Sequence, residues 1–171
     1  MDEHRRQPRR PRAGRLVISE REELLKGLRS MPVVLRRLVH GLPDAAVRRR
    51  PELGEWAIVE VVAHLADTDE RTLERLRLML AEESPELLAY DQAALAEERA
   101  YLSMPLEREL ARFESLRAEH VALLESLDDA GWRRIGRHSE HGPVTVQQLT
   151  AHSGGEDMDH LAQIARLVPS R

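Results

Sequence analysis

Apolar residues recur three or four positions apart in four long segments of the chain, and proline, glycine and polar residues separate these segments. Residues at that spacing share one face of a helix, and charged residues here occupy the opposite face. The pattern predicts amphipathic helices over about 19–41, 56–81, 105–128 and 145–168. Four such helices predict an all-α fold, a four-helix bundle with a longer crossover between the second and third helices.

Local signals place the expected boundaries of these elements. Ser19 starts a capping-box spacing at the beginning of the first helix, and Pro32 is expected to kink or divide that helix. The dipeptide Ser84–Pro85 ends the second helix. The crossover is expected to contain a shorter helix around residues 87–98, whereas residues 131–143 are expected to form a turn-rich stretch.

The composition argues against several classes of protein. Hydrophobic residues make up 42% of the chain and charged residues 33%, whereas aromatic residues reach only 3%. That balance suits helices and argues strongly against an all-β sandwich. The chain has no cysteine, so disulfides, thiolate zinc fingers, iron–sulfur clusters and thiol nucleophiles are excluded. A metal ion would have to be bound by histidine, carboxylate or carbonyl groups.

Positive charge is concentrated at the start of the chain. Residues 1–15 contain six arginines and two acidic residues, while the whole chain has a net charge of −4, so the remainder carries about −8. We therefore expect a disordered basic arm over 1–17 and one domain over 18–171. The acidic domain argues against a specific nucleic-acid partner. The lack of a long apolar segment or secretion signal argues against a membrane partner and favours a cytoplasmic location.

Polar residues interrupt the apolar stripe of the last helix. Ser153, Glu156 and His160 continue, at helical spacing, the positions that apolar residues hold elsewhere in this segment. Burial of an unpaired carboxylate costs several kcal/mol, so Glu156 and His160 need a partner. A metal ion could serve both side chains, and a buried Glu–His or Glu–Arg pair is the alternative.

A third ligand must come from another helix. His152 cannot bind the same ion as His160, because eight helical residues separate them by roughly 12 Å along the axis, and we expect its side chain to be partly exposed. His64 flanks the apolar stripe of the second helix, with a hydrogen bond to a carbonyl as its alternative role. Asp67, one turn later, is expected to be a solvated surface charge.

Other polar residues give weaker indications. Arg117 and His120 fall on the apolar face of the third helix, where they could line a polar pocket as catalytic residues beside the metal. Arg117 would then bind an anionic substrate group, or simply pair with a buried carboxylate. His138 and His141 lie in a polar loop and are expected to be solvated. The chain contains no serine-hydrolase elbow, phosphate-binding loop or dinucleotide-binding fingerprint.

Two segments resemble a known family. Trp56–Asp67, with the sequence WAIVEVVAHLAD, resembles the W-S-x-x-E-V-x-x-H-L-x-D signature of the DinB/YfiT-like superfamily. Asp157–Ile164, with the sequence DMDHLAQI, resembles that family's closing H-D-x-x-H-L-x-Q-I motif. Residues 136–146 are similar to the stretch that leads into the family's last helix. The resemblance spans roughly residues 20–168 and implies the four-helix bundle.

The resemblance also implies a metal site. In that family one histidine of the second helix and two of the last hold a divalent metal ion, often zinc or nickel. Carried over by position, the ligands are His64, Glu156 and His160, so Glu156 replaces the first closing histidine. Two histidines and one carboxylate also suit iron or manganese, and a degenerate site is the alternative. Ala57 replaces the motif's serine and removes a capping hydroxyl.

The activity that the resemblance implies is broad. The resemblance implies a metal-dependent enzyme of the hydrolase or thiol-transferase type. Such an enzyme activates a water or a low-molecular-weight thiol toward a small-molecule substrate. A homodimer is expected, as in many relatives, and Leu78 and Leu87–Leu88 are candidates for its surface. The rival hypothesis is a non-catalytic bundle that binds a ligand or partner chain, with Glu156 paired to His64, His160 or Arg117.

Overall fold

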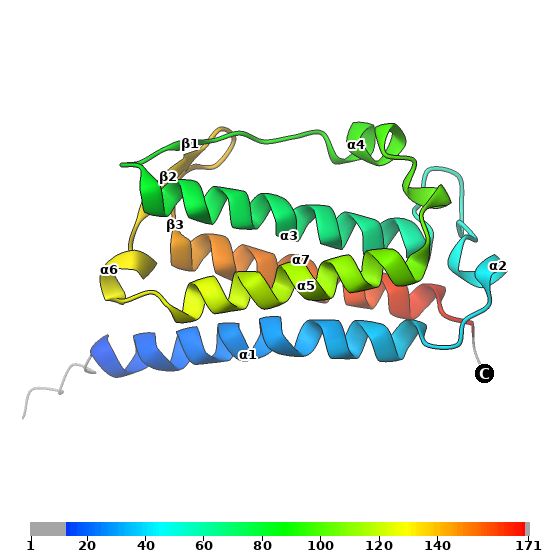
Figure 1. Cartoon of the computed structure of the whole chain (residues 1–171), viewed down its shortest axis with the longest axis horizontal. Helices are drawn as coiled ribbons and strands as arrows, with labels where there is room; N and C mark the ends of the chain where they lie inside the picture. Colours follow the sequence, from blue (N-terminus) through cyan, green and yellow to red (C-terminus); the bar gives the residue numbers. More distant parts are fainter. Residues whose placement is uncertain (1–12, 170–171) are drawn as a thin grey trace, which may run out of the picture.

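The computed structural model describes residues 13–169 and consists of four long helices packed side by side (Figure 1). They are α1 (Ala13–Val39), α3 (Ile58–Ala81), α5 (Leu106–Glu125) and α7 (Val146–Leu167). Both α1 and α3 pack against α5 and α7. The predicted all-α four-helix bundle, with its long crossover between the second and third long helices, is confirmed.

Shorter elements connect these helices. They are α2 (Asp44–Val47), β1 (Glu86–Leu87), α4 (Gln92–Glu98), η1 (Tyr101–Ser103), α6 (Asp129–Trp132), β2 (Ile135–His138) and β3 (Gly142–Thr145). The helix expected in the crossover is therefore present as α4, but it begins later than predicted because the strand β1 precedes it. Among the described helices, none offers an apolar span long enough to traverse a lipid bilayer.

A small sheet lies at one end of the bundle, with its strands in the order β1–β2–β3 (Figure 1). β1 runs parallel to β2, and β2 is antiparallel to β3, with His138 opposite Gly142. The prediction of a turn-rich stretch over 131–143 missed β2 and the start of β3, because such short strands hold too few residues for an alternating pattern to show. Gly136 lets the sheet pack closely, since a Cβ atom there would lie 2.6 Å from Cδ1 of Leu87.

The first helix is longer and more continuous than predicted. α1 begins at Ala13, so Ser19 lies inside the helix and is not its N-cap. No proline interrupts residues 13–19, and the helix extends past the expected cap. The helix also continues through Pro32, with Leu28 and Leu35 buried on either side. Residues 1–12, which make up most of the expected basic arm, lie outside the described residues.

Two main clusters of apolar side chains fill the bundle. One surrounds Phe113, and the other surrounds Leu76 and includes Leu87. Leu87 is only 1% exposed, so the expectation that it contributes to a dimer surface is wrong. Leu78 is half-buried against the same cluster, and Leu88 is exposed. The homodimer itself stays a prediction.

Candidate metal centre

The helices that carry the candidate ligands have well-defined starts. At α3, where the serine of the family motif is missing, Oε2 of Glu60 accepts a hydrogen bond from the backbone N–H of Ala57 at 2.9 Å. At α7, Oγ1 of Thr145 accepts one from the backbone N–H of Gln148 at 3.1 Å. These contacts satisfy backbone donors that the first turn of a helix leaves unpaired. Glu60 thus keeps its half of the capping box, while its own backbone N–H, which the lost hydroxyl would have accepted from, donates to the carbonyl of Ala57 at 3.0 Å.

The structure brings His64, Glu156 and His160 together between α3 and α7. One potential ligand atom from each of the three residues lies within 4.8 Å of the other two. The rings of His64 and His160 meet edge to face, with their centroids 4.8 Å apart. We call these three residues the candidate centre.

The rotation of α7 differs from the sequence prediction. The predicted inward stripe ran through Ser153, Glu156 and His160, but the buried polar residues of α7 include Ser153 and Asp157. The side chains of Glu156 and His160 keep 31% and 16% of their exposure. Asp157 was not predicted to be buried, although its spacing from Ser153 and Ile164 is helical. The candidate centre thus lies at the edge of the core, where a small molecule can reach it.

His64 provides the buried side of the candidate centre. Its ring lies 4.9 Å from that of Trp56, and its Nε2 is 3.4 Å from Oγ1 of Thr68. A proton on Nε2 would leave the lone pair of Nδ1 free, and Nδ1 is buried without a hydrogen-bond partner among the described residues. Burial, with a smaller effect from nearby His160, lowers the pKa of His64 to about 4. The imidazole is therefore neutral at neutral pH, as metal binding requires.

Glu156 and His160 form the accessible side. His160 Nδ1 lies 2.9 Å from Oε1 of Gln163 and can donate to it, which leaves its Nε2 with a free lone pair. This Nε2 is 3.8 Å from Oε2 of Glu156, whose other oxygen is 4.0 Å from His152. The side chain of His152 is 65% exposed, so the prediction of partial exposure is confirmed. A histidine oriented by a second hydrogen bond is typical of metal ligands.

These residues fit a divalent metal ion. A buried imidazole nitrogen without a partner costs about 1–3 kcal/mol, and a bound cation would remove that cost. Tetrahedral zinc, with bonds of about 2.0–2.2 Å, separates its ligand atoms by roughly 3.4 Å. Since the three candidate atoms already lie within 4.8 Å of one another, modest side-chain rotations suffice. Two nitrogens and one carboxylate would leave a coordination position open.

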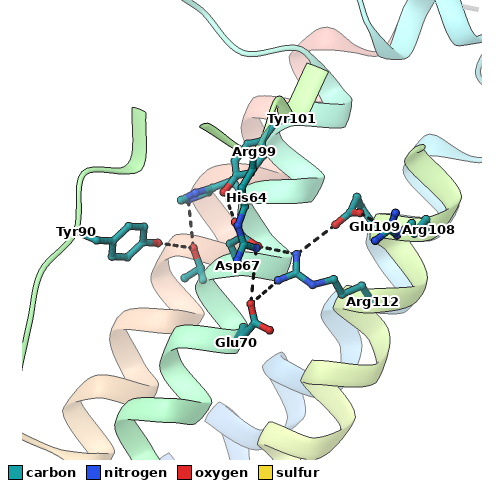
Figure 2. Close-up of polar contacts among 10 residues, drawn as sticks. His64, Asp67, Glu70, Tyr90, Arg99, Tyr101, Arg108, Glu109 and Arg112 are labelled. Atoms are coloured by element: carbon teal, nitrogen blue, oxygen red, sulfur yellow. Dashed lines mark hydrogen bonds and ion pairs between the residues drawn. The ribbon is translucent and has the colours of Figure 1, made fainter. Parts of the chain in front are cut away.

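Asp67, one turn after His64, is buried and is not the solvated surface charge that we expected. Its carboxylate accepts hydrogen bonds from Tyr101 and, at 2.6 Å, from Arg99 (Figure 2). Arg112 of α5 forms a third contact, an ion pair of 2.6 Å. Arg99 and Tyr101 belong to the crossover, which folds back over this face of α3, and helical periodicity within α3 does not reveal that cover.

Arg117 and His120 belong to a separate buried network. The guanidinium of Arg117 donates to Asp69 at 2.7 Å and to both oxygens of Asp157. His120 Nδ1 lies 3.0 Å from Asp69, and its Nε2 has no partner among the described residues. Of the two expected roles of Arg117, the structure shows the pairing with buried carboxylates. Neither Arg117 nor His120 makes a hydrogen bond or ion pair to the candidate centre within the described part of the chain.

The loop histidines form a second group at the tip of the β2–β3 hairpin. The rings of His138 and His141 stack with their centroids 4.7 Å apart, and Glu140 lies beside them. Nδ1 of His138 accepts a hydrogen bond from the backbone N–H of Glu140 at 3.2 Å. His141 and Glu140 are exposed, as predicted for solvated loop residues, whereas His138 is half-buried.

A cavity of about 670 Å³ opens beside the candidate centre. His160 lines it together with Trp56, the residue that packs on His64, and with Gln163. A larger cavity, of about 760 Å³, lies near Trp132 and is lined by none of the three candidate ligands. The smaller cavity is therefore the one that bears on the chemistry.

Comparison with known proteins agrees with this arrangement. The sequence model of the DinB superfamily matches residues 27–164. A protein of Geobacillus kaustophilus described as a "putative metal-dependent hydrolase" is 30% identical over 149 residues, which cover 86% of this chain and 84% of that protein. YfiT of Bacillus subtilis, with the same description, is 26% identical over 149 residues, or 86% of this chain and 84% of YfiT.

The solved structure of YfiT from Bacillus subtilis has a similar fold. Its TM-score is 0.82 at 24% sequence identity, and the match covers 95% of this chain and 91% of that one. The structure is described as "a probable metal-dependent hydrolase with an unusual four-helix bundle topology". At this level of identity the likeness shows that the two chains share their fold.

Proposed function

The chain belongs to the DinB superfamily, and we propose that it is a metal-dependent hydrolase whose divalent metal ion is held by His64, Glu156 and His160. One observation carries the proposal: three potential ligand atoms converge within 4.8 Å at the positions that the family motifs mark. Curated relatives described as metal-dependent hydrolases support it. Zinc is the first choice, because two histidines and one carboxylate form a known open zinc site. Nickel, iron and manganese follow.

The bound ion and the residues around it have separate roles. When bound, a divalent ion supplies acidification, since it lowers the pKa of a water or of a low-molecular-weight thiol toward neutrality. His64 offers a neutral nitrogen from the core, and Gln163 orients His160. The partly exposed Glu156 keeps the centre open to solvent. The substrate is a small molecule that enters from the adjoining cavity.

Elemental analysis of the purified, untagged protein tests the proposal. We expect about one equivalent of zinc, nickel, iron or manganese per chain, and hydrolysis of small esters or amides that a chelator abolishes. If the activity requires an added thiol, the reaction is a thiol transfer and not a hydrolysis. No bound metal after incubation with each ion would overturn the proposal and favour the non-catalytic bundle.

A further inference from the structure

Helix α3 carries three more polar side chains on the face that holds His64. Thr68, Arg71 and Arg75 follow His64 by four, seven and eleven positions. At about 100° per residue, these four side chains fall within a stripe roughly 60° wide. His64 is buried, and the other three are partly exposed. The stripe therefore leads from the candidate centre to the surface.

A chain of contacts joins Arg71 to the candidate centre. The guanidinium of Arg71 lies over the ring of Tyr90, 4.2 Å from its centroid. The hydroxyl of Tyr90 points to Thr68 and is 3.4 Å from its Oγ1 (Figure 2). The same Oγ1 is 3.4 Å from Nε2 of His64.

A second chain of neighbours leads from Arg75 back to the candidate centre along α7. Arg75 donates a hydrogen bond to the carbonyl of Leu88, and the preceding residue, Leu87, pairs with His138 in the sheet. Burial lowers the pKa of His138, and the charges of Arg75 and His152 lower it further. His152 in turn is 4.0 Å from Glu156. Arg71 and Arg75 thus lie on the face of α3 that carries His64, with Arg75 beside the strand that pairs with His138.

Neither of these arginines is neutralised by a close carboxylate. Within the described residues, Arg71 and Arg75 make no ion pair within 4.0 Å, whereas Arg77 and Arg112 pair with Glu119 and Glu70. Arg75 donates one hydrogen bond, to the carbonyl of Leu88 at 2.6 Å. Burial and the nearby Arg71 lower its pKa, although Tyr90, Glu140 and Glu74 act in the opposite direction. Two partly buried guanidiniums on one stripe therefore retain unused donors that suit an anion.

We propose that Arg71 and Arg75 bind an anionic oxygen group of the substrate, a carboxylate or a phosphate, while the reacting end of the same molecule reaches the candidate centre. The inference rests on the proposed function and names its substrate class. At a rise of about 1.5 Å per residue, Arg71 and Arg75 lie roughly 10 and 16 Å beyond His64 along α3. Helical side chains lean toward the N-terminus, which brings both guanidiniums back toward His64. The substrate is thus an extended small molecule with an anion at one end.

Anion binding by the metal-free protein tests the site without any chemistry. Inorganic phosphate and succinate are titrated separately at constant ionic strength and followed by NMR. We expect saturable binding of at least one of them, and the tighter one identifies the anion type. The double variant Arg71→Ala/Arg75→Ala should bind about tenfold more weakly or worse.

The control for this titration removes the same charge elsewhere. The variant Arg37→Ala/Arg77→Ala should bind like the wild type, because both of its arginines are exposed and off the stripe. Since Arg75→Ala could loosen the loop at Leu88, Arg71→Ala alone is measured as well. Equal affinities in all variants, or no binding of either anion to the wild type, would overturn the proposal.

A matched pair of thiols tests whether the anion site and the candidate centre bind one molecule. Mercaptohexanoate and mercaptohexanol differ in the anion, and cobalt-loaded protein reports thiolate binding by its visible absorption. The wild type should bind the acid about tenfold more tightly than the alcohol. The variant Arg71→Ala/Arg75→Ala should bind the acid and the alcohol equally well. If cobalt does not bind, the proposed function fails and the phosphate titration alone decides the anion site. If cobalt binds and the acid has no advantage, the anion site is overturned.

Discussion

Arg117 of α5 holds Asp157 of α7 with both terminal nitrogens of its guanidinium, at N–O distances of 2.5 and 2.9 Å. Consecutive residues of a helix point about 100° apart. Fixing Asp157 in the core therefore turns its neighbour Glu156 toward the partly exposed edge of the core, where it meets His64 and His160. The ion pair thus sets the direction in which α7 presents its two candidate ligands.

The first prediction concerns Glu156. The substitution Glu156→Ala should weaken zinc binding by more than about a hundredfold, because even the outer partners of metal ligands contribute about 10–100-fold. Glu156→His, which restores the family's usual ligand, should keep zinc and lose some affinity for manganese, a metal that prefers oxygen ligands. Competition with a chelating dye measures both affinities.

Asp159→Ala is the matched control for that experiment. It removes the same charge from the same helix at an exposed position that is not part of the candidate centre. Its zinc affinity should equal that of the wild type. Full zinc occupancy in Glu156→Ala would remove Glu156 from the ligand set.

The second prediction concerns Gln163, whose Oε1 lies 2.9 Å from Nδ1 of His160. Gln163→Leu removes the acceptor that orients the imidazole, and we expect zinc affinity to fall by about 10–100-fold. Gln163→Glu keeps an acceptor and should retain most of the affinity. Isothermal titration of both variants checks this, and equal losses in the two would contradict the orienting role.

The bundle and the starts of its last three long helices could be predicted from the sequence because they depend on local patterns. Apolar spacing marked the four long helices, and Thr145 caps α7 close to the predicted start. Strand β1 was missed because it pairs with residues about fifty positions along the chain, and β2 and β3 were missed because four residues are too few for an alternating pattern to show. Pro32 was expected to kink or divide the first helix, but α1 is not divided there, and Leu28 and Leu35 are buried on either side of the proline.

The candidate centre was predictable as a set of residues but not as an arrangement. Motif positions and helical spacing brought out His64, Glu156 and His160, whereas the rotation of α7 depends on Asp157 and its distant partner Arg117. Likewise, Asp67 becomes buried only because the crossover supplies Arg99 and Tyr101 to cover it. Such contacts between distant segments leave no trace in a helical pattern.

The third prediction concerns the buried network. Arg117→Met would leave the carboxylates of Asp69 and Asp157 buried without their cation, and we expect it to lower the free energy of unfolding by about 3–5 kcal/mol. Arg77→Ala, which breaks an exposed pair with Glu119, should cost less than about 1 kcal/mol. Urea unfolding of both variants measures this. Similar small costs in the two would mean that the network does not hold α5 against α7.

The fourth prediction concerns Tyr101, one of only two tyrosines in the chain. Burial, together with the hydrogen bond and the negative charge of Asp67, raises the pKa of Tyr101. The hydroxyl of Tyr101 therefore loses its proton at a lower pH in the unfolded chain than in the folded one. Its protonation stabilises the fold below pH about 10, and this stabilisation is lost as the pH rises further. Absorbance titration of the native protein should therefore show no ionisation of Tyr101 before unfolding, and Tyr101→Phe should leave the native titration unchanged. A second tyrosine that ionises before unfolding would show that the Asp67 network opens in solution.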